Sequence, residues 1–197
     1  MPKKTAYHHG ALKSALLNEA ATLIRAQGTE AVTMRELATR LGVSRTAAYR
    51  HFENKEALLV AVAAEGFERL AMALHAAGEG QTGRDRVEAM GQAYVRFALA
   101  NPAHYRLMYG REALRRREIP ALQAAADQAY DELVALIEAE QHSGLLRAGD
   151  ARQLVYVAWA LVHGLALLLV DGQMEEPDDT DALAALAIRT LLDGLAA

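Results

Sequence analysis

The sequence predicts an all-α protein, and three observations favour this fold class. Only four prolines occur in the 197 residues. Alanine and leucine, both good helix formers, are abundant, whereas runs of β-branched residues are few. Apolar side chains also recur at helical spacing, between residues that typically begin or end helices. With a hydrophobic content of 52%, we expect a packed protein of about nine helices.

The first part of the chain carries short helices whose ends are marked by capping residues. Thr33 and Glu36 have the spacing of a capping box, in which Thr33 caps the helix and Glu36 reaches back. Gly42 suits the end of this helix, because glycine adopts a left-handed backbone conformation at little cost. The expected helices are 11–27, 33–42, one capped by Ser44 and running to about Phe52, and a longer one capped by Asn54 at 55–77.

The second part follows the sequence GEGQTG at residues 78–83, the clearest break in the chain. Its helices are expected to be longer and more apolar. They are predicted at 84–100, 102–110, 119–142, 151–171 and 178–195. We expect two domains, an N-terminal domain of residues 1–54 and a C-terminal helical bundle of residues 55–197.

Charge is distributed unevenly between the two ends of the chain. Residues 1–55 contain nine Lys and Arg against four acidic residues, which gives a net charge of +5. The other 142 residues contain 12 basic and 21 acidic residues, a net charge of −9. A positive N-terminal segment in a chain of net charge −4 indicates that this segment meets a polyanion.

Several classes of function are disfavoured by what the sequence lacks. It contains no cysteine, which excludes disulfides, thiolate zinc sites and a cysteine nucleophile. There is no G-x-S-x-G motif and no glycine-rich phosphate loop, so an enzyme is not expected. The histidines lack the close spacing of metal ligands, and we expect neither a metal nor a cofactor.

Two short helices joined by a turn at Gly42 have the form of a helix-turn-helix unit. On the second of them, Ala48 and Phe52 are expected to face inward. Recognition helices read base edges with their N-terminal residues. We therefore expect base contacts from Arg45, Thr46 and Ala47, and phosphate contacts from Tyr49, His51 and Lys55. Arg50 lies further along the exposed face and receives no role.

The stretch from Thr33 to Leu59 reads T-x-R-E-L-A-x-x-L-G-V-S-x-x-x-x-Y-R-H-F-x-x-K-E-A-L-L. It resembles the DNA-binding domain of the TetR family of transcriptional regulators, except that Ala48 stands where leucine is frequent. The resemblance implies base contacts by Arg35, Arg45, Thr46 and Ala47. It implies phosphate contacts by Thr33, Ser44, Tyr49, His51 and Lys55, with Lys3, Lys4, Tyr7, His8 and His9 as an arm along the backbone.

In the second half, Trp159 followed by Val162-His163-Gly164 resembles the tryptophan–histidine–glycine signature of one class of TetR C-terminal domains. This resemblance implies a homodimer formed by the helices at 151–171 and 178–195. It also implies a pocket for a small-molecule effector, which we expect to be a neutral or weakly polar organic compound. The side chains expected to line it are Phe67, Met90, Tyr94, Phe97, Tyr105, Met108, Trp159 and His163. His163 is also typical of a hydrogen-bonded core histidine.

Residues 154–170 form an uncharged stretch of 17 residues, for which a membrane span is one interpretation. The stretch is short for a span and has His163-Gly164 near its middle. We instead expect a helix between the core and a partner subunit, and no membrane partner. The N-terminus carries charges with no apolar segment after them, so we expect no signal peptide and a cytoplasmic protein.

These patterns predict a dimeric regulator, most simply a repressor that binds a palindromic double-stranded DNA operator and is released by the effector. The effector is expected to change the spacing of the two reading helices through the helix at 55–77. The main alternative is a helical DNA-binding or scaffold protein without an effector. An enzyme is the weaker alternative.

Overall fold

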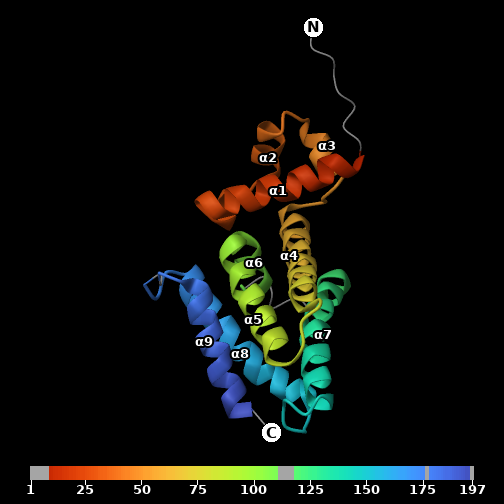
Figure 1. The fold of residues 1–197 in the computed structure, drawn as a ribbon. Helices are drawn as coiled ribbons and strands as arrows, with labels where there is room; N and C mark the ends of the chain where they lie inside the picture. The colour runs from red at the N-terminus through yellow and green to blue at the C-terminus, as the bar shows by residue number, and fades with distance from the viewer. Residues whose placement is uncertain (1–8, 111–117, 176–177, 196–197) are drawn as a thin grey trace. The chain divides into compact units, whose positions relative to one another are not determined.

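The computed structural model describes residues 9–110, 118–175 and 178–195. All regular elements among these residues are helical, which confirms the predicted fold class (Figure 1). The helices are α1 (His9–Gln27), the short 3₁₀ helix η1 (Thr29–Ala31), α2 (Met34–Arg40), α3 (Arg45–Tyr49), α4 (Lys55–Gly78), α5 (Gly83–Ala100), α6 (Pro102–Tyr109), α7 (Pro120–His142), α8 (Ala151–Val170) and α9 (Thr180–Leu195). The predicted helices agree with these within a few residues, but η1 was missed.

The chain divides into two compact units. One contains Met1–Glu65 and Ala103–Leu122, and the other contains Gly66–Pro102 and Gln123–Ala197. The long helix α4 begins in the first unit and ends in the second. The predicted functional division at residue 54 stays a prediction.

In the first unit, α2 packs against both α1 and α3. Thr33 Oγ1 accepts the Glu36 N–H at 3.1 Å, and Ser44 Oγ accepts the Ala47 N–H at 3.1 Å. Gly42 has a φ of 64° in the turn between α2 and α3, as its expected left-handed conformation requires. These local interactions confirm the predicted helix starts and the helix-turn-helix geometry.

Two details of this unit differ from the prediction. Glu36 does not reach back to complete the capping box, because its carboxylate pairs with Arg40 one turn later at 2.7 Å. Arg40 also lies 3.2 Å from Glu19 and so ties α2 to α1. The helix α3 ends at Tyr49, before the predicted Phe52, and the His51 and Phe52 N–H groups both bond to the Ala48 carbonyl in the turn that follows. Phe52 is nevertheless buried, as expected.

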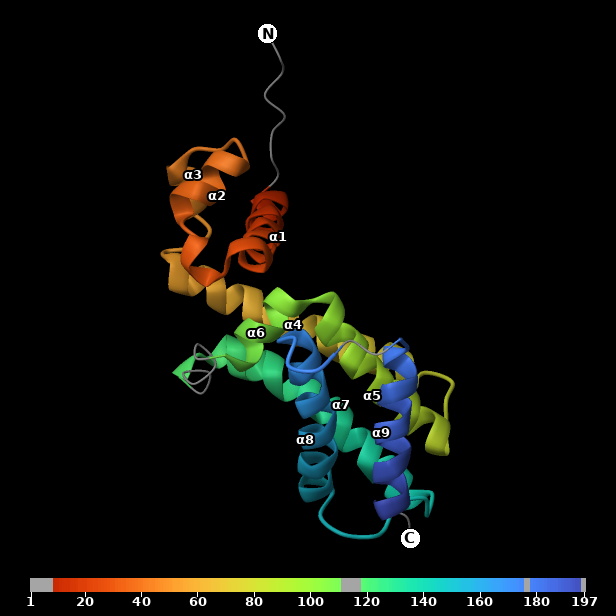
Figure 2. The same cartoon turned by 90° about the vertical axis from the view of Figure 1, so that its left-hand side faces the viewer.

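In the second unit, α5, α8 and α9 pack against one another. Figure 2 shows α8 and α9 lying side by side. Ion pairs join α5 to α9 at Arg84–Asp193, Glu88–Arg189 and Arg96–Asp181, with N···O distances of 2.9, 2.9 and 2.6 Å. From one pair to the next, the residue numbers increase along α5 and decrease along α9. The two helices are therefore antiparallel and held in a fixed register.

Candidate functional site

The helix α3 presents the residues that we expect to read DNA bases. Arg45 and Thr46 are exposed at its start, while Ala47 is half-buried beside them. Ala48 is fully buried behind this face, where a larger side chain would have to displace the core. Arg35, the base-contact candidate from α2, is also exposed. Because Thr46 and Ala47 have small side chains, this part of the α3 surface allows close approach of another molecule.

The expected phosphate contacts lie at the ends of these short helices. Thr33 and Ser44 are exposed, and each hydroxyl oxygen accepts a backbone N–H, which leaves the hydroxyl proton to donate elsewhere. Tyr49 is 45% exposed, an unusual degree for a large aromatic residue on a packed helix. His51 and Lys55 are half-buried. The arm residues Lys3, Lys4, Tyr7 and His8 lie outside the described residues.

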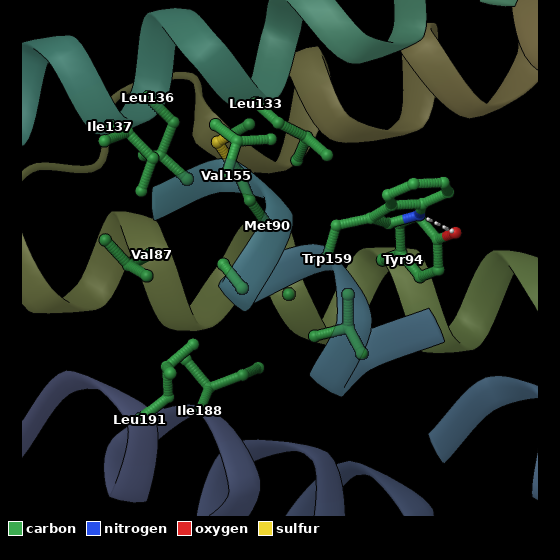
Figure 3. Close-up of a pocket in the computed structure, with 13 residues that line it drawn as sticks. Val87, Met90, Tyr94, Leu133, Leu136, Ile137, Val155, Trp159, Ile188 and Leu191 are labelled. Atoms are coloured by element: carbon green, nitrogen blue, oxygen red, sulfur yellow. Dashed lines mark hydrogen bonds between the residues drawn. The ribbon is translucent and has the colours of Figure 1, made fainter. Parts of the chain in front are cut away.

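The second unit contains a cavity of about 50 Å³ between α5, α7, α8 and α9, which is partly open to the surface (Figure 3). None of the described side chains that line it carries a charge. They are Val87, Met90, Gly91, Tyr94, Leu133, Leu136, Ile137, Val155, Ala158, Trp159, Val162, Ile188 and Leu191. A charged molecule would lose its hydration here without gaining a counter-charge, so the lining favours uncharged, apolar occupants.

A chain of three hydrogen-bonding side chains lies at the edge of this cavity. The Trp159 Nε1–H donates to the Tyr94 hydroxyl oxygen at 2.9 Å, as Figure 3 shows. The same oxygen lies 3.2 Å from His163 Nδ1. Burial lowers the pKa of His163, which favours a neutral imidazole whose Nδ1 accepts the Tyr94 O–H. As expected for a core histidine, His163 is hydrogen-bonded.

The lowered pKa of His163 predicts a pH-dependent stability. Below the ordinary pKa of about 6.5, the unfolded chain binds a proton that the folded chain does not yet bind. The free energy of unfolding therefore decreases as the pH falls from about 6.5 to the lowered pKa, and this decrease ends below it. The His163→Gln variant should lose this component, so its Tm should fall less than that of the parent between pH 7 and pH 5. Equal pH slopes for both chains would contradict the prediction.

The eight predicted effector contacts separate in the structure. Met90, Tyr94 and Trp159 line the cavity, and His163 bonds to Tyr94. Phe67 and Phe97 are buried in the same unit without lining this cavity, whereas Tyr105 and Met108 belong to the other unit. The remaining lining residues are mostly aliphatic, and sequence reasoning missed them because their helical spacing is the same as that of ordinary core residues. The recurrence of Val155, Trp159 and Val162 on one face of α8 was the available signal.

The opposite face of α8 and α9 is apolar and exposed. Tyr156, Val157, Leu168 and Leu186 are exposed by 57, 50, 42 and 57%. An open groove on this face is lined by Val157, Leu161, Ala187, Thr190, Leu191 and Gly194. In length and composition α8 could also span a membrane, and 22% of that segment is buried within the chain. We call the exposed apolar residues of these two helices the α8–α9 face.

Aromatic packing extends this face toward α7. The rings of Tyr130 on α7 and Tyr156 on α8 lie with centroids 5.8 Å apart. The guanidinium of Arg152 lies 5.7 Å from the centre of the Tyr130 ring. Tyrosine and arginine are enriched at the centres of protein interfaces.

Comparisons with known proteins agree with both parts of the chain. Residues 16–62 match the family described as bacterial regulatory proteins, tetR family, and residues 87–191 match the tetracyclin repressor-like C-terminal domain. A solved protein of unknown function from Rhodococcus sp. RHA1 is 34% identical, with 98% of this chain and 100% of that chain covered and a TM-score of 0.85.

Two curated relatives come from Mycobacterium tuberculosis. An uncharacterized HTH-type transcriptional regulator, Rv0681, is 28% identical over 190 residues, which cover 93% of this chain and 81% of the relative. The HTH-type transcriptional repressor Rv1474c is 37% identical over 94 residues, 47% of this chain and 49% of that protein. Both similarities are to proteins named as regulators of transcription.

Proposed function

Because the chain belongs to the TetR family of bacterial transcriptional regulators, we propose that it is a dimeric repressor that an uncharged small molecule releases from a palindromic operator. Regulators of this family bind DNA operators, usually as homodimers that respond to small-molecule effectors, and they are not enzymes. The observation that carries the proposal is the exposed start of α3, which presents Arg45 and Thr46 from a segment with a net charge of +5.

The residues around α3 divide by what they can contact. Arg45 has the paired donors that match O6 and N7 of guanine, and the methyl groups of Thr46 and Ala47 suit a thymine methyl. Thr33, Ser44, Tyr49, His51 and Lys55 offer hydroxyl, imidazole or ammonium donors to phosphate oxygens. Arg40 contributes less to this surface, since Glu36 and Glu19 neutralise it. We place these contacts in an N-terminal DNA-binding domain of residues 1–54, except that of Lys55, which is the first residue of α4.

We assign the second copy of the chain to the α8–α9 face. Val157, Leu168 and Leu186 expose large apolar side chains there that would be costly to leave in water. The open groove contains Gly194, and a Cβ built on either Gly164 or Gly194 meets nothing within 4 Å. These glycines allow another helix to approach closely. Burial of this face by a second copy also accounts for the high hydropathy of α8 in a family of soluble regulators.

We assign the effector to the cavity beside Tyr94. Its volume of about 50 Å³ is well below the roughly 150 Å³ of an engineered cavity that holds benzene. An effector of ordinary size would therefore have to push the surrounding helices apart. Binding of this kind favours one arrangement of the helices over another, as a ligand-operated switch requires. A thermal-shift screen of uncharged apolar compounds separates this proposal from a DNA-binding protein without an effector.

Operator selection from randomised DNA tests the roles given to individual residues. Arg45→Ala should weaken binding to the selected operator by about 1–3 kcal/mol and relax the preference at one base pair in each half-site. Lys55→Ala is the matched control, since loss of a phosphate contact should weaken binding to all sequences and flatten the plot of log K against log salt. Unchanged base preferences in Arg45→Ala would contradict its base-reading role, and an unchanged salt slope in Lys55→Ala would contradict its phosphate contact.

A further inference from the structure

The cavity and the α8–α9 face share the same two helices. On α8, Ala158 and Val162 line the cavity, while Val157 and Leu161 line the outer groove. On α9, Ile188 lines the cavity and Leu191 lines both the cavity and the groove. One layer of helices therefore separates the two spaces, and a helix that moves at one of them must move at the other. None of the described cavity-lining residues comes from α4 or α6.

The contact between α9 and α5 leaves Ile188 little room to retreat. A Cβ built on Gly91 would lie 2.8 Å from Ile188 Cγ1 and closer still to Cδ1. Ile188 thus already fills the space that the absent side chain of Gly91 leaves. An occupant of the cavity that presses on Ile188 cannot drive it further into α5, because protein interiors are close-packed. The remaining direction is outward, together with α9.

The ion pairs that hold α9 against α5 can yield to such a push. Arg84–Asp193 and Arg96–Asp181 are formed by side chains that are about half-exposed or more, while in the third pair Arg189 is 51% and Glu88 26% exposed. Ion pairs in contact with water contribute little individually. They fix the register of α9 without preventing a small outward displacement.

We propose that an occupant of the cavity displaces α9 and thereby weakens the association of two copies through the α8–α9 face. Release of the operator then results from loss of the dimer, in place of a signal carried by α4. The inference depends on the dimer face and the effector cavity of the proposed function, and it specifies how the cavity is regulated. The chemical class of the occupant is uncharged and apolar, as the lining requires.

Ala158→Leu tests this route without knowledge of the natural effector. The added carbon atoms project from α8 into a cavity of about 50 Å³ and overfill it. We expect the dimer dissociation constant, measured by sedimentation velocity, to rise about tenfold or more, within the usual range of coupling between two sites. The matched control is Ala158→Leu with Ile188→Ala, which keeps the total volume nearly constant and should return the constant toward that of the parent. If the leucine variant does not fold, Ala158→Val takes its place, because it adds fewer carbon atoms to the cavity.

Two outcomes would overturn the inference. One is a folded Ala158→Leu or Ala158→Val chain that dimerises like the parent. The added side chain would then have displaced α7 and not α9. The other is a double variant that dissociates as readily as the single one. A parent that stays monomeric also overturns the inference, whatever its DNA binding. If the parent selected no DNA sequence, only the proposed function would be contradicted. The dimer dissociation constants of the variants would still test whether an occupant of the cavity weakens the dimer.

Discussion

Val157→Glu is expected to convert the dimer to monomers and to raise its dissociation constant about 1,000-fold, or about 4 kcal/mol. Val157 is 50% exposed on α8 and lines the outer groove with Leu161 and Leu191. In a symmetric dimer each copy would bury one new carboxylate among apolar side chains. Among the described residues, no Lys or Arg lines this groove to neutralise the charge. Sedimentation velocity over a range of protein concentrations measures the effect.

The same variant should lose most of its affinity for a palindromic operator. In a dimer, once one DNA-binding domain occupies its half-site, the other domain meets the second half-site at a high effective concentration. A monomer lacks this advantage. Val157→Thr provides the control, because threonine keeps the shape of valine and can bond its hydroxyl to a carbonyl of its own helix. A Val157→Glu chain that sediments as a dimer and binds the operator like the parent would show that the α8–α9 face is not the dimer interface.

Features that depend on local interactions could be predicted from the sequence. Thr33, Ser44 and Asn54 cap helices through bonds to backbone N–H groups three residues later, at 3.1, 3.1 and 2.8 Å. Gly42 has the expected positive φ. Each of these features needs only a few neighbouring residues. The capping box predicted at Glu36 is not completed, and this difference does not depend on neighbouring residues alone. Arg40, the partner of Glu36, also bonds to Glu19 on α1.

The cavity could not be predicted in the same way. Tyr94 and Trp159 carry polar groups that buried positions must satisfy, and this chemistry identified them as candidates. Leu133, Ile137 and Ile188 line the same cavity, but nothing in their spacing distinguishes a cavity wall from a filled core. Whether helices leave a gap depends on side chains from α5, α7, α8 and α9 together. The sequence therefore indicated Met90 and the polar edge of the cavity but missed its aliphatic walls.

The second large effect is expected from Tyr94, which is 1% exposed and joins the half-buried polar groups of Trp159 and His163. Tyr94→Ala should decrease the free energy of unfolding by about 4 kcal/mol, the usual cost of removing a large aromatic side chain from a core. For a chain of this length, each kcal/mol lowers the Tm by about 2–4 °C, which gives a fall of roughly 8–16 °C. Denaturant unfolding and calorimetry measure the two quantities.

Tyr94→Phe separates packing from hydrogen bonding at this position. It keeps the ring but removes the oxygen that accepts the Trp159 N–H at 2.9 Å and lies 3.2 Å from His163 Nδ1. Because these partners would lose a buried bond, we expect a cost of about 1–3 kcal/mol. Tyr130→Phe is the matched control, since the Tyr130 hydroxyl donates to the Arg152 carbonyl at 3.4 Å at an exposed site. If Tyr94→Phe cost no more than Tyr130→Phe, the hydrogen-bonded chain would not stabilise the fold, and Tyr94 would act by packing alone.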